Sequence, residues 1–178
     1  MNKTQGRKST RLQTYNYSTP GLYFVTICVH NHSCLFGSIG DGEMRCNQLG
    51  KIVEQQWKTT ISSFPGIKSD EWVVMPNHFH GLIHLLEHSE QRLVQTNTND
   101  HANTTRRKML IPKVVGKYKM QTSKLINQVL DRKGKTLWMR GYWDRVVRNE
   151  AELYRIREYI ANNPLKWELD RLNPNNNL

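Results

Sequence analysis

The 178-residue sequence has few cysteines and no long apolar run. Its three cysteines, Cys28, Cys34 and Cys46, are odd in number and form no Cys-x-x-Cys pair, so neither a disulfide framework nor a thiolate zinc site is indicated. No apolar run approaches the roughly 20 residues that a membrane-spanning helix needs, and the polar start of the chain lacks the apolar core of a secretory signal. We therefore expect a soluble, cytoplasmic protein with reduced thiols.

The signatures of several enzyme classes are also missing. The sequence contains no P-loop, no HExxH, no GxSxG and no acidic cluster of the kind that holds two metal ions in nucleases. These absences exclude several nuclease chemistries. A metal-dependent enzyme with this sequence would need another nucleophile.

Acidic residues are scarce in two stretches of the chain. The formal net charge is +11, and residues 1–40 hold four basic groups and no acidic group, while residues 112–149 hold ten basic groups and two acidic groups. A fold does not need such an imbalance, so we expect a polyanionic partner, with nucleic acid favoured. The alternatives are a solubilising surface and a membrane-surface helix, although the apolar residues within 112–130 fit a helix that faces a core equally well.

The pattern of apolar residues predicts an α+β domain. Strands are predicted over 22–29, 67–75, 78–86 and 136–147, a hairpin around the turn Gly40-Asp41-Gly42, and helices over 48–62, 112–130 and 149–163. This order of elements favours a sandwich in which helices pack on one face of a largely antiparallel sheet, with a small β-hairpin insertion. We expect a basic N-terminal arm over 1–20, one domain over 21–168 that contains a mobile loop over 87–108, and a loose tail over 169–178.

A candidate metal site lies on the strand predicted over 78–86. Side chains on a strand alternate between its faces, so His78 and His80 point the same way, with Cα atoms roughly 6.5 to 7 Å apart, while Phe79 points to the opposite layer. Two imidazoles can therefore meet one metal ion. The alternative is a pair of ordinary, partly exposed histidines.

The last predicted helix supplies a candidate nucleophile. Tyr159 and Asn163 are four residues apart and lie on one helical face, separated by roughly 40°. Tyr154 points roughly 140° away from Tyr159 and is the poorer candidate. The alternative for Tyr159 is a partly buried tyrosine whose hydroxyl finds a structural partner.

Four segments together resemble a known protein family. They are Tyr15-Asn-Tyr-Ser-Thr-Pro-Gly-Leu-Tyr-Phe-Val-Thr26, Met75-Pro-Asn-His-Phe-His-Gly81, Tyr142-Trp-Asp-Arg-Val-Val-Arg-Asn149 and Tyr159-Ile-Ala-Asn-Asn-Pro-Leu-Lys-Trp167. Their joint occurrence over roughly residues 10 to 168 resembles the single-tyrosine HUH transposases, and more narrowly the REP-associated tyrosine transposases.

This resemblance implies a ferredoxin-like catalytic domain that cuts and rejoins single-stranded DNA beside imperfect palindromic hairpins, with Mg²⁺ or Mn²⁺ as cofactor. By motif position, His78 and His80 are implied as metal ligands, Asn163 as a third, polar ligand and Tyr159 as the nucleophile. Attack by the tyrosine leaves a 5′-phosphotyrosine that conserves the energy of the broken phosphodiester, so no nucleotide cofactor is expected. Related enzymes act as monomers or as homodimers, and both states stay open here.

Basic and aromatic residues are candidates for contacts with DNA. The basic candidates are Arg7, Lys8, Arg11, Lys113, Lys117, Lys119, Lys124, Arg140, Arg145 and Arg148, with Arg132, Lys133 and Lys135 in the same stretch. Trp138, Tyr142 and Trp143 are candidates for stacking on unpaired bases. The alternative for each of these residues is a solvated helix face or an aromatic of the core.

Two other functions compete with strand transfer. One is a catalytically inactive hairpin-binding protein or repressor with the same fold, whose binding would survive the changes His78→Ala and His80→Ala. The other is a small-molecule metallohydrolase, which is disfavoured because the basic stretch would then have no purpose.

Overall fold

A computed structural model of the chain describes residues 19–87 and 110–177. In chain order, the strands and α-helices of this part are β1 Gly21–Cys28, β2 Gly37–Gly40, β3 Glu43–Cys46, α1 Gln48–Ser62, β4 Ile67–Met75, β5 His78–Leu85, α3 Leu110–Val129, β6 Trp143–Val147 and α4 Glu150–Ala161. Three short 3-10 helices are η1 His30–His32, η2 Trp167–Leu169 and η3 Pro174–Asn177.

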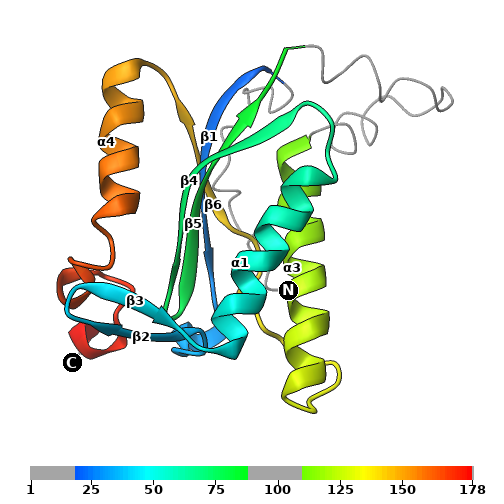
Figure 1. Cartoon of the computed structure of the whole chain (residues 1–178), viewed down its shortest axis with the longest axis vertical. Helices are drawn as coiled ribbons and strands as arrows, with labels where there is room; N and C mark the ends of the chain where they lie inside the picture. The colour runs from blue at the N-terminus through cyan, green and yellow to red at the C-terminus, as the bar shows by residue number, and fades with distance from the viewer. Residues whose placement is uncertain (1–18, 88–109, 178) are drawn as a thin grey trace, which may run out of the picture.

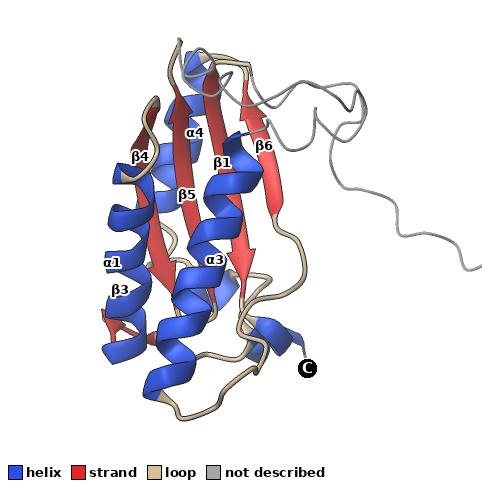
Figure 2. Ribbon diagram, turned by 90° about the vertical axis from the view of Figure 1, so that its right-hand side faces the viewer, coloured by secondary structure: helices blue, strands red, loops and turns tan. Residues whose placement is uncertain are grey.

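The strands form one antiparallel sheet and one separate hairpin. The sheet has the order β4-β5-β1-β6, with β1 and β5 in its centre, and β2 pairs with β3 in the hairpin. The succession β1, α1, β4, β5, α3, β6 with this strand order is the ferredoxin-like arrangement, into which the hairpin is inserted between β1 and α1. The predicted α+β class, antiparallel sheet and hairpin are therefore confirmed (Figure 2).

The three helices cover both faces of the sheet. Helices α1 and α3 pack on one face and build the main core, in which the ring of Trp57 lies 4.6 Å from that of Phe79 and 5.3 Å from that of Tyr118. Helix α4 lies on the opposite face, where Ile156 and Ile160 pack against Leu82 in a smaller cluster (Figure 1). The expectation of helices on one face thus holds for α1 and α3 and is wrong for α4. Leu82 of β5, together with apolar residues of the other three strands, gives the sheet a second apolar surface.

Asparagine caps fix where two helices begin. The Asn47 side chain accepts hydrogen bonds from the amides of Leu49 and Gly50 at the start of α1, at 2.9 and 3.0 Å. Asn149 accepts one from the amide of Glu152 at the start of α4, at 2.8 Å. Both starts agree with the sequence prediction.

The strand predicted over 136–147 is shorter than expected. Only β6 is regular, and the preceding residues join the sheet through a single bridge between Val29 and Trp138. The Lys119 ammonium donates hydrogen bonds to the carbonyl oxygens of Met139 and Gly141, at 2.7 and 2.6 Å. The Lys119 side chain therefore forms hydrogen bonds with carbonyl oxygens that would otherwise be free to pair with a neighbouring strand.

The segment expected to be a loose tail is tied to the domain over its described length. The Asn77 amide donates to the Leu172 carbonyl oxygen at 2.6 Å, and that of Asn173 donates to the Trp167 carbonyl oxygen at 3.1 Å. The prediction of a loose 169–178 is therefore wrong for these residues, because buried amides hold the backbone. The expected arm is described only from residue 19 and the expected loop only at residue 87, so Arg7, Lys8 and Arg11 lie outside the described residues.

Two further expectations concern thiols and membranes. Cys28, Cys34 and Cys46 are all free, and burial raises the pKa of Cys28 and of Cys46 to about 12, so both thiols are protonated. Among residues 19–87 and 110–177, no helix combines the length and apolar character needed to cross a membrane.

Candidate active site

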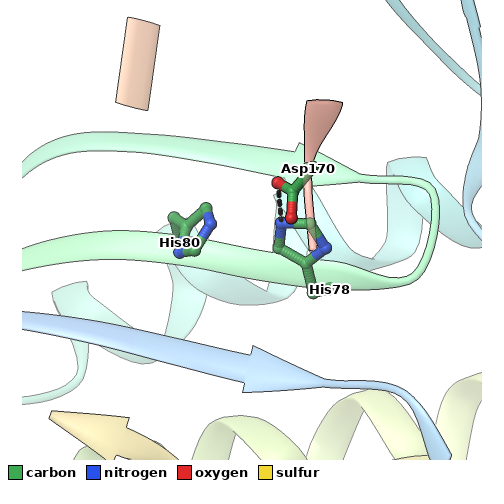
Figure 3. Close-up of side chains that lie close together, drawn as sticks. All are labelled: His78, His80 and Asp170. Carbon is green, nitrogen blue, oxygen red and sulfur yellow. Dashed lines mark ion pairs between the residues drawn. The ribbon is translucent and has the colours of Figure 1, made fainter. Parts of the chain in front are cut away.

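The two histidines lie side by side on the central strand β5. His78 and His80 face the α4 side of the sheet, and their ring centroids are 4.6 Å apart (Figure 3). The antiparallel register pairs them with Cys28 and Thr26 of β1, and Phe79 points into the main core. The predicted sharing of one face by the two imidazoles is confirmed.

Both imidazoles are buried and held by neighbours. His78 is 0% exposed and His80 is 2% exposed. Nδ1 of His80 lies 2.8 Å from the Thr26 hydroxyl, and Nδ1 of His78 lies 2.8 Å from Oδ1 of Asn77. In each ring, Nδ1 is engaged by a polar side chain, and Nε2 is the atom left to face the site.

Burial keeps both rings neutral. It lowers the pKa of His78 to about 4, although the Asp170 carboxylate and the Asn163 amide act in the opposite direction. Burial, followed by the proximity of His78, lowers the pKa of His80 well below its usual value. Neutral imidazole is the form that binds metal ions, so both rings are in that form at neutral pH.

Tyr159 reaches the histidines from helix α4. Its hydroxyl lies 3.3 Å from Nε2 of His80, and the two ring centroids are 5.2 Å apart. Phe24 stacks on His80 and meets Tyr159 edge to face, so one aromatic side chain of β1 supports both rings. Burial, followed by the Asp170 carboxylate, raises the pKa of Tyr159, so the phenol is protonated at neutral pH.

Asn163 lies four residues beyond Tyr159 and is 2% exposed. Helix α4 ends at Ala161 rather than at the predicted residue 163, so Asn163 belongs to the turn that follows the helix. Its side chain raises the pKa of His78 and lowers that of Tyr159, which places it beside both groups. Within the described part of the chain, its Oδ1 is buried without a hydrogen-bond partner. Asn163 therefore lies beside the His78 imidazole and the Tyr159 phenol.

Asp170 is a residue of this candidate site that no sequence motif predicts. Its carboxylate lies 3.9 Å from Nε2 of His78, and potential ligand atoms of Asp170, His78 and His80 all lie within 4.8 Å of one another (Figure 3). Asp170 follows η2 in a segment without apolar periodicity, so no spacing rule connects it to β5. Its place is set by the hydrogen bonds that anchor this segment.

These residues fit a divalent metal ion. Nε2 of His78 and Oδ1 of Asn163 are both buried without hydrogen-bond partners among the described residues, which calls for a ligand at that place. Imidazole nitrogen, amide oxygen and carboxylate oxygen together form a donor set that suits first-row divalent ions such as Mn²⁺.

A pocket of about 350 Å³ opens beside the tyrosine. Its walls are Phe24, Thr26, His80, Trp143, Tyr159, Asp170, Arg171 and Leu172. Trp143 extends from edge strand β6 and is 46% exposed, and Tyr159 is 44% exposed. The pocket therefore combines a tyrosine hydroxyl, aromatic surfaces and groups of both charges.

The predicted DNA-contacting residues occupy different places. Lys113, Lys117 and Lys124 belong to α3, on the opposite layer from Tyr159. Arg140 precedes β6 in the chain and Arg148 follows it, and both side chains are exposed. Within residues 19–87 and 110–177, the predicted basic residues are therefore not among those that line the pocket.

Several of the basic and aromatic candidates have structural contacts. Lys117 donates to the Ser63 hydroxyl at 2.8 Å, and Arg132 donates to the side-chain oxygen of Asn127 at 3.0 Å. Lys119 binds backbone carbonyls, as described above, and Arg145 forms a 2.6 Å ion pair with Glu152. Trp138 is 4% exposed and donates its indole hydrogen to Thr122, so it is an aromatic of the core and cannot stack on a base in this conformation.

No protein-family profile matches the chain. Among solved structures, a REP-associated tyrosine transposase bound to a REP hairpin has a TM-score of 0.49 at 16% sequence identity, over 92% of this chain and 74% of that chain. A proposed transposase from Deinococcus radiodurans R1 has a TM-score of 0.46 at 16% identity, over 91% of this chain and 97% of that chain.

The sequence is also similar to an uncharacterized protein from Haemophilus influenzae (strain ATCC 51907 / DSM 11121 / KW20 / Rd). The two are 35% identical over 177 residues, which cover 93% of this chain and 92% of the relative. Because this identity extends over nearly the whole of both proteins, the chain belongs to the same protein family as that Haemophilus influenzae protein.

Proposed function

We propose that this protein cuts and rejoins single-stranded DNA beside palindromic hairpins, with Tyr159 as the nucleophile. The observation that carries this proposal is the 3.3 Å contact between the Tyr159 hydroxyl and Nε2 of His80. The two residues come from a helix and a strand that are far apart in the sequence, and both line one open pocket. A half-exposed phenol at that place is accessible to a polymeric substrate, unlike a tyrosine of the core.

The reaction that suits these groups is transfer of a phosphodiester to tyrosine. The Tyr159 oxygen forms a bond to phosphorus, the bond from phosphorus to the 3′-oxygen breaks, and the phenol proton ends on the departing 3′-hydroxyl. The product is a 5′-phosphotyrosine ester. Attack by another 3′-hydroxyl reverses these steps and rejoins the strand without a nucleotide cofactor.

The proposed ligands of the metal ion are His78, His80 and Asn163, with the Asp170 carboxylate as an added candidate. A bound Mg²⁺ or Mn²⁺ supplies positive charge to the non-bridging oxygens of the scissile phosphate. His80 would hold the ion through Nε2, the atom that the Tyr159 hydroxyl contacts in this structure, so the hydroxyl would give up this contact when an ion is bound. Because burial raises the pKa of Tyr159, the phenol enters the reaction protonated and must lose its proton during the attack.

Contacts with DNA are proposed on both sides of the sheet. Trp143 offers an exposed indole beside Tyr159 for stacking on an unpaired base. Phosphate contacts are proposed for Lys113, Lys117, Lys124, Arg140 and Arg148, which are exposed or half-exposed. Because the histidines and the tyrosine of one chain already meet, we propose that one chain completes the site.

The proposal is tested by a search for the covalent adduct. The full-length protein is incubated with labelled hairpin oligonucleotides that carry single-stranded flanks, in Mn²⁺ or Mg²⁺, and the products are separated on a denaturing gel. We expect a protein–DNA band that EDTA abolishes. Tyr159→Phe should eliminate the band because it removes the oxygen that bonds to phosphorus.

Tyr154→Phe is the matched control. Tyr154 lies on the same helix, is 69% exposed and does not line the pocket, so its variant should form the adduct as the wild type does. The proposal is wrong if the wild type forms no adduct across such substrates, or if Tyr159→Phe still forms it. Hairpin binding without cleavage would instead support the inactive DNA-binding alternative.

A further inference from the structure

Asn77 occupies a central place beside the site without belonging to the proposed ligand set. It lies in the Pro76–Asn77 turn between β4 and β5 and is 0% exposed. Its side chain makes three hydrogen bonds, to the His32 and Leu172 carbonyl oxygens and to the His78 ring. The backbone carbonyl oxygen of Asn77 also accepts a hydrogen bond from the backbone amide of Val29.

These partners determine which way the Asn77 amide points. Two carbonyl oxygens lie 3.0 and 2.6 Å from Nδ2, those of His32 and Leu172. A carbonyl oxygen only accepts hydrogen bonds, so the NH₂ group must face both of them. Oδ1 of Asn77 is then the atom that faces Nδ1 of His78, at 2.8 Å.

The orientation of the amide in turn determines the tautomer of His78. An amide oxygen can only accept, so Nδ1 of His78 must carry the ring hydrogen. A neutral imidazole has a single N–H, which leaves Nε2 of His78 with its lone pair. That nitrogen is buried, has no hydrogen-bond partner in the part of the chain that the structure describes, and lies 3.9 Å from the Asp170 carboxylate.

The same amide also holds the segment that carries Asp170. The hydrogen bond to the Leu172 carbonyl oxygen fixes the backbone two residues beyond Asp170, across 95 positions of sequence. The bond to the His32 carbonyl oxygen holds η1, in which Asn31 and His32 have φ values of 56° and 51° in the left-handed region. One buried side chain thus joins β5, η1 and the C-terminal segment.

We propose that Asn77 is a positioning residue that locks His78 in the Nδ1–H tautomer and ties this histidine to the Asp170 segment. The metal-ligand part of this inference rests on the proposed function. Partners of this kind fix the orientation and tautomer of ligating histidines in metal sites, and their loss typically weakens metal binding by about 10- to 100-fold.

The tautomer is measured directly in the wild-type protein without metal. Long-range ¹H–¹⁵N NMR spectra in EDTA at neutral pH distinguish the two neutral forms of each histidine ring. We expect His78 as the Nδ1–H tautomer. Observation of the Nε2–H tautomer, or of a mixture of both, overturns the inference, and this measurement needs no variant that has to fold.

Two substitutions separate the two roles of the amide. Asn77→Asp keeps an oxygen toward His78, so the Nδ1–H tautomer should persist. Its other oxygen cannot donate to the carbonyls of His32 and Leu172, so amide hydrogen exchange in residues 170–173 should become about tenfold faster. Asn77→Ala removes both roles. It should give a mixed tautomer, equally fast exchange, and Mn²⁺ binding weakened by about 10- to 100-fold in a spin-resonance titration.

Asn173→Asp is the matched control, because it makes the same change at a different buried asparagine, which lies three residues after Asp170. It should leave the His78 tautomer as in the wild type. Wild-type exchange in Asn77→Asp, or wild-type Mn²⁺ affinity in a folded Asn77→Ala, overturns the inference. If the tautomer and exchange results hold while no covalent adduct forms, the proposed strand transfer fails and the positioning role of Asn77 stands.

Discussion

At the scale of single residues, the site joins two buried imidazoles to a half-exposed phenol. Thr26 and Asn77 engage the Nδ1 atoms of the two rings, and the aromatic ring of Phe24 supports His80 and Tyr159 from β1. These contacts constrain the rings before any substrate arrives. This arrangement costs free energy of folding, because two polar imidazoles are removed from water.

This cost predicts that acid destabilises the metal-free protein. Burial lowers the pKa of His78 to about 4 and that of His80 well below its usual value, whereas both titrate near 6.5 when unfolded. Between these values the unfolded chain binds protons that the folded chain does not, so the free energy of unfolding falls as the pH falls. The slope is at most about 1.4 kcal/mol per pH unit for each imidazole.

Urea unfolding in EDTA at several pH values between about 4.5 and 7.5 measures this slope. His78→Gln removes one of the titrating groups and should therefore give a shallower dependence. Equal slopes for the wild type and for His78→Gln contradict the prediction. The pKa values of Asp70 and Glu152 are also lowered in the folded protein. Their stabilising contacts are lost when the carboxylates are protonated, which happens at a pH below the range measured here.

A second prediction at this scale concerns Trp143. If its exposed indole stacks on a base beside Tyr159, Trp143→Ala should weaken the binding of a single-stranded oligonucleotide by roughly 5- to 150-fold, as for the loss of one stacked base. Trp143→Phe keeps an aromatic face and should lose much less. Fluorescence anisotropy on the Tyr159→Phe background measures binding without cleavage, and equal affinities for the alanine and phenylalanine variants contradict stacking.

At the scale of elements, the position of α4 decides where Tyr159 lies. Arg157 makes two hydrogen bonds to the Asp70 carboxylate of β4, and Glu152 near the helix start pairs with Arg145 of β6. The Asn149 cap fixes the first turn. Helix α4 is therefore attached to both edge strands of the sheet, and Tyr159 extends from its last turns toward the central strand.

The two capping asparagines provide a test of this attachment. Asn149→Ala should lower the free energy of unfolding by about 1 kcal/mol and reduce the rate of adduct formation, because the helix that carries Tyr159 is loosened. Asn47→Ala removes the cap of α1 at a similar cost in stability but should leave the rate of adduct formation unchanged. Equal loss of activity in the two variants contradicts a specific role for α4.

Elements with strong periodicity or a clear cap could be predicted from the sequence. The start of α1 after Asn47 and that of α4 after Asn149 are examples, and the alternation of β5 placed His78 and His80 on one face. The role of Asp170 could not be predicted, because it depends on hydrogen bonds between residues that are far apart in sequence. Charge alone likewise did not show that Lys119 and Arg145 have structural partners.

At the scale of the whole molecule, the candidate site and much of the basic surface lie on different faces. Helix α3 with Lys113, Lys117 and Lys124 packs on the α1 face of the sheet, and Tyr159 lies on the other face (Figure 1). A nucleic acid that touches both must pass around an edge of the sheet. Strand β6 is the edge strand next to the pocket, and Trp143 extends from it.

The lysines of α3 should therefore act on affinity rather than on the cleavage step. Lys113→Glu with Lys124→Glu should weaken hairpin binding and lower the slope of log affinity against log salt concentration by about 1 per lost phosphate contact. At saturating protein, the rate of adduct formation should stay close to wild type. Lys51→Glu on α1 is the control for charge alone, and an equal effect of that change contradicts a specific DNA surface on α3.

The thickness of the layered domain sets the length of DNA that is needed to reach both surfaces. A sheet with a helix layer on each side has three layers, and since each layer adds about 10 Å, its outer surfaces are roughly 30 Å apart. A strand anchored on one surface and cut on the other must contain enough nucleotides to span this detour. The spacing between a recognised stem and its scission point would accordingly be dictated by the architecture of the protein, and not only by which bases it reads.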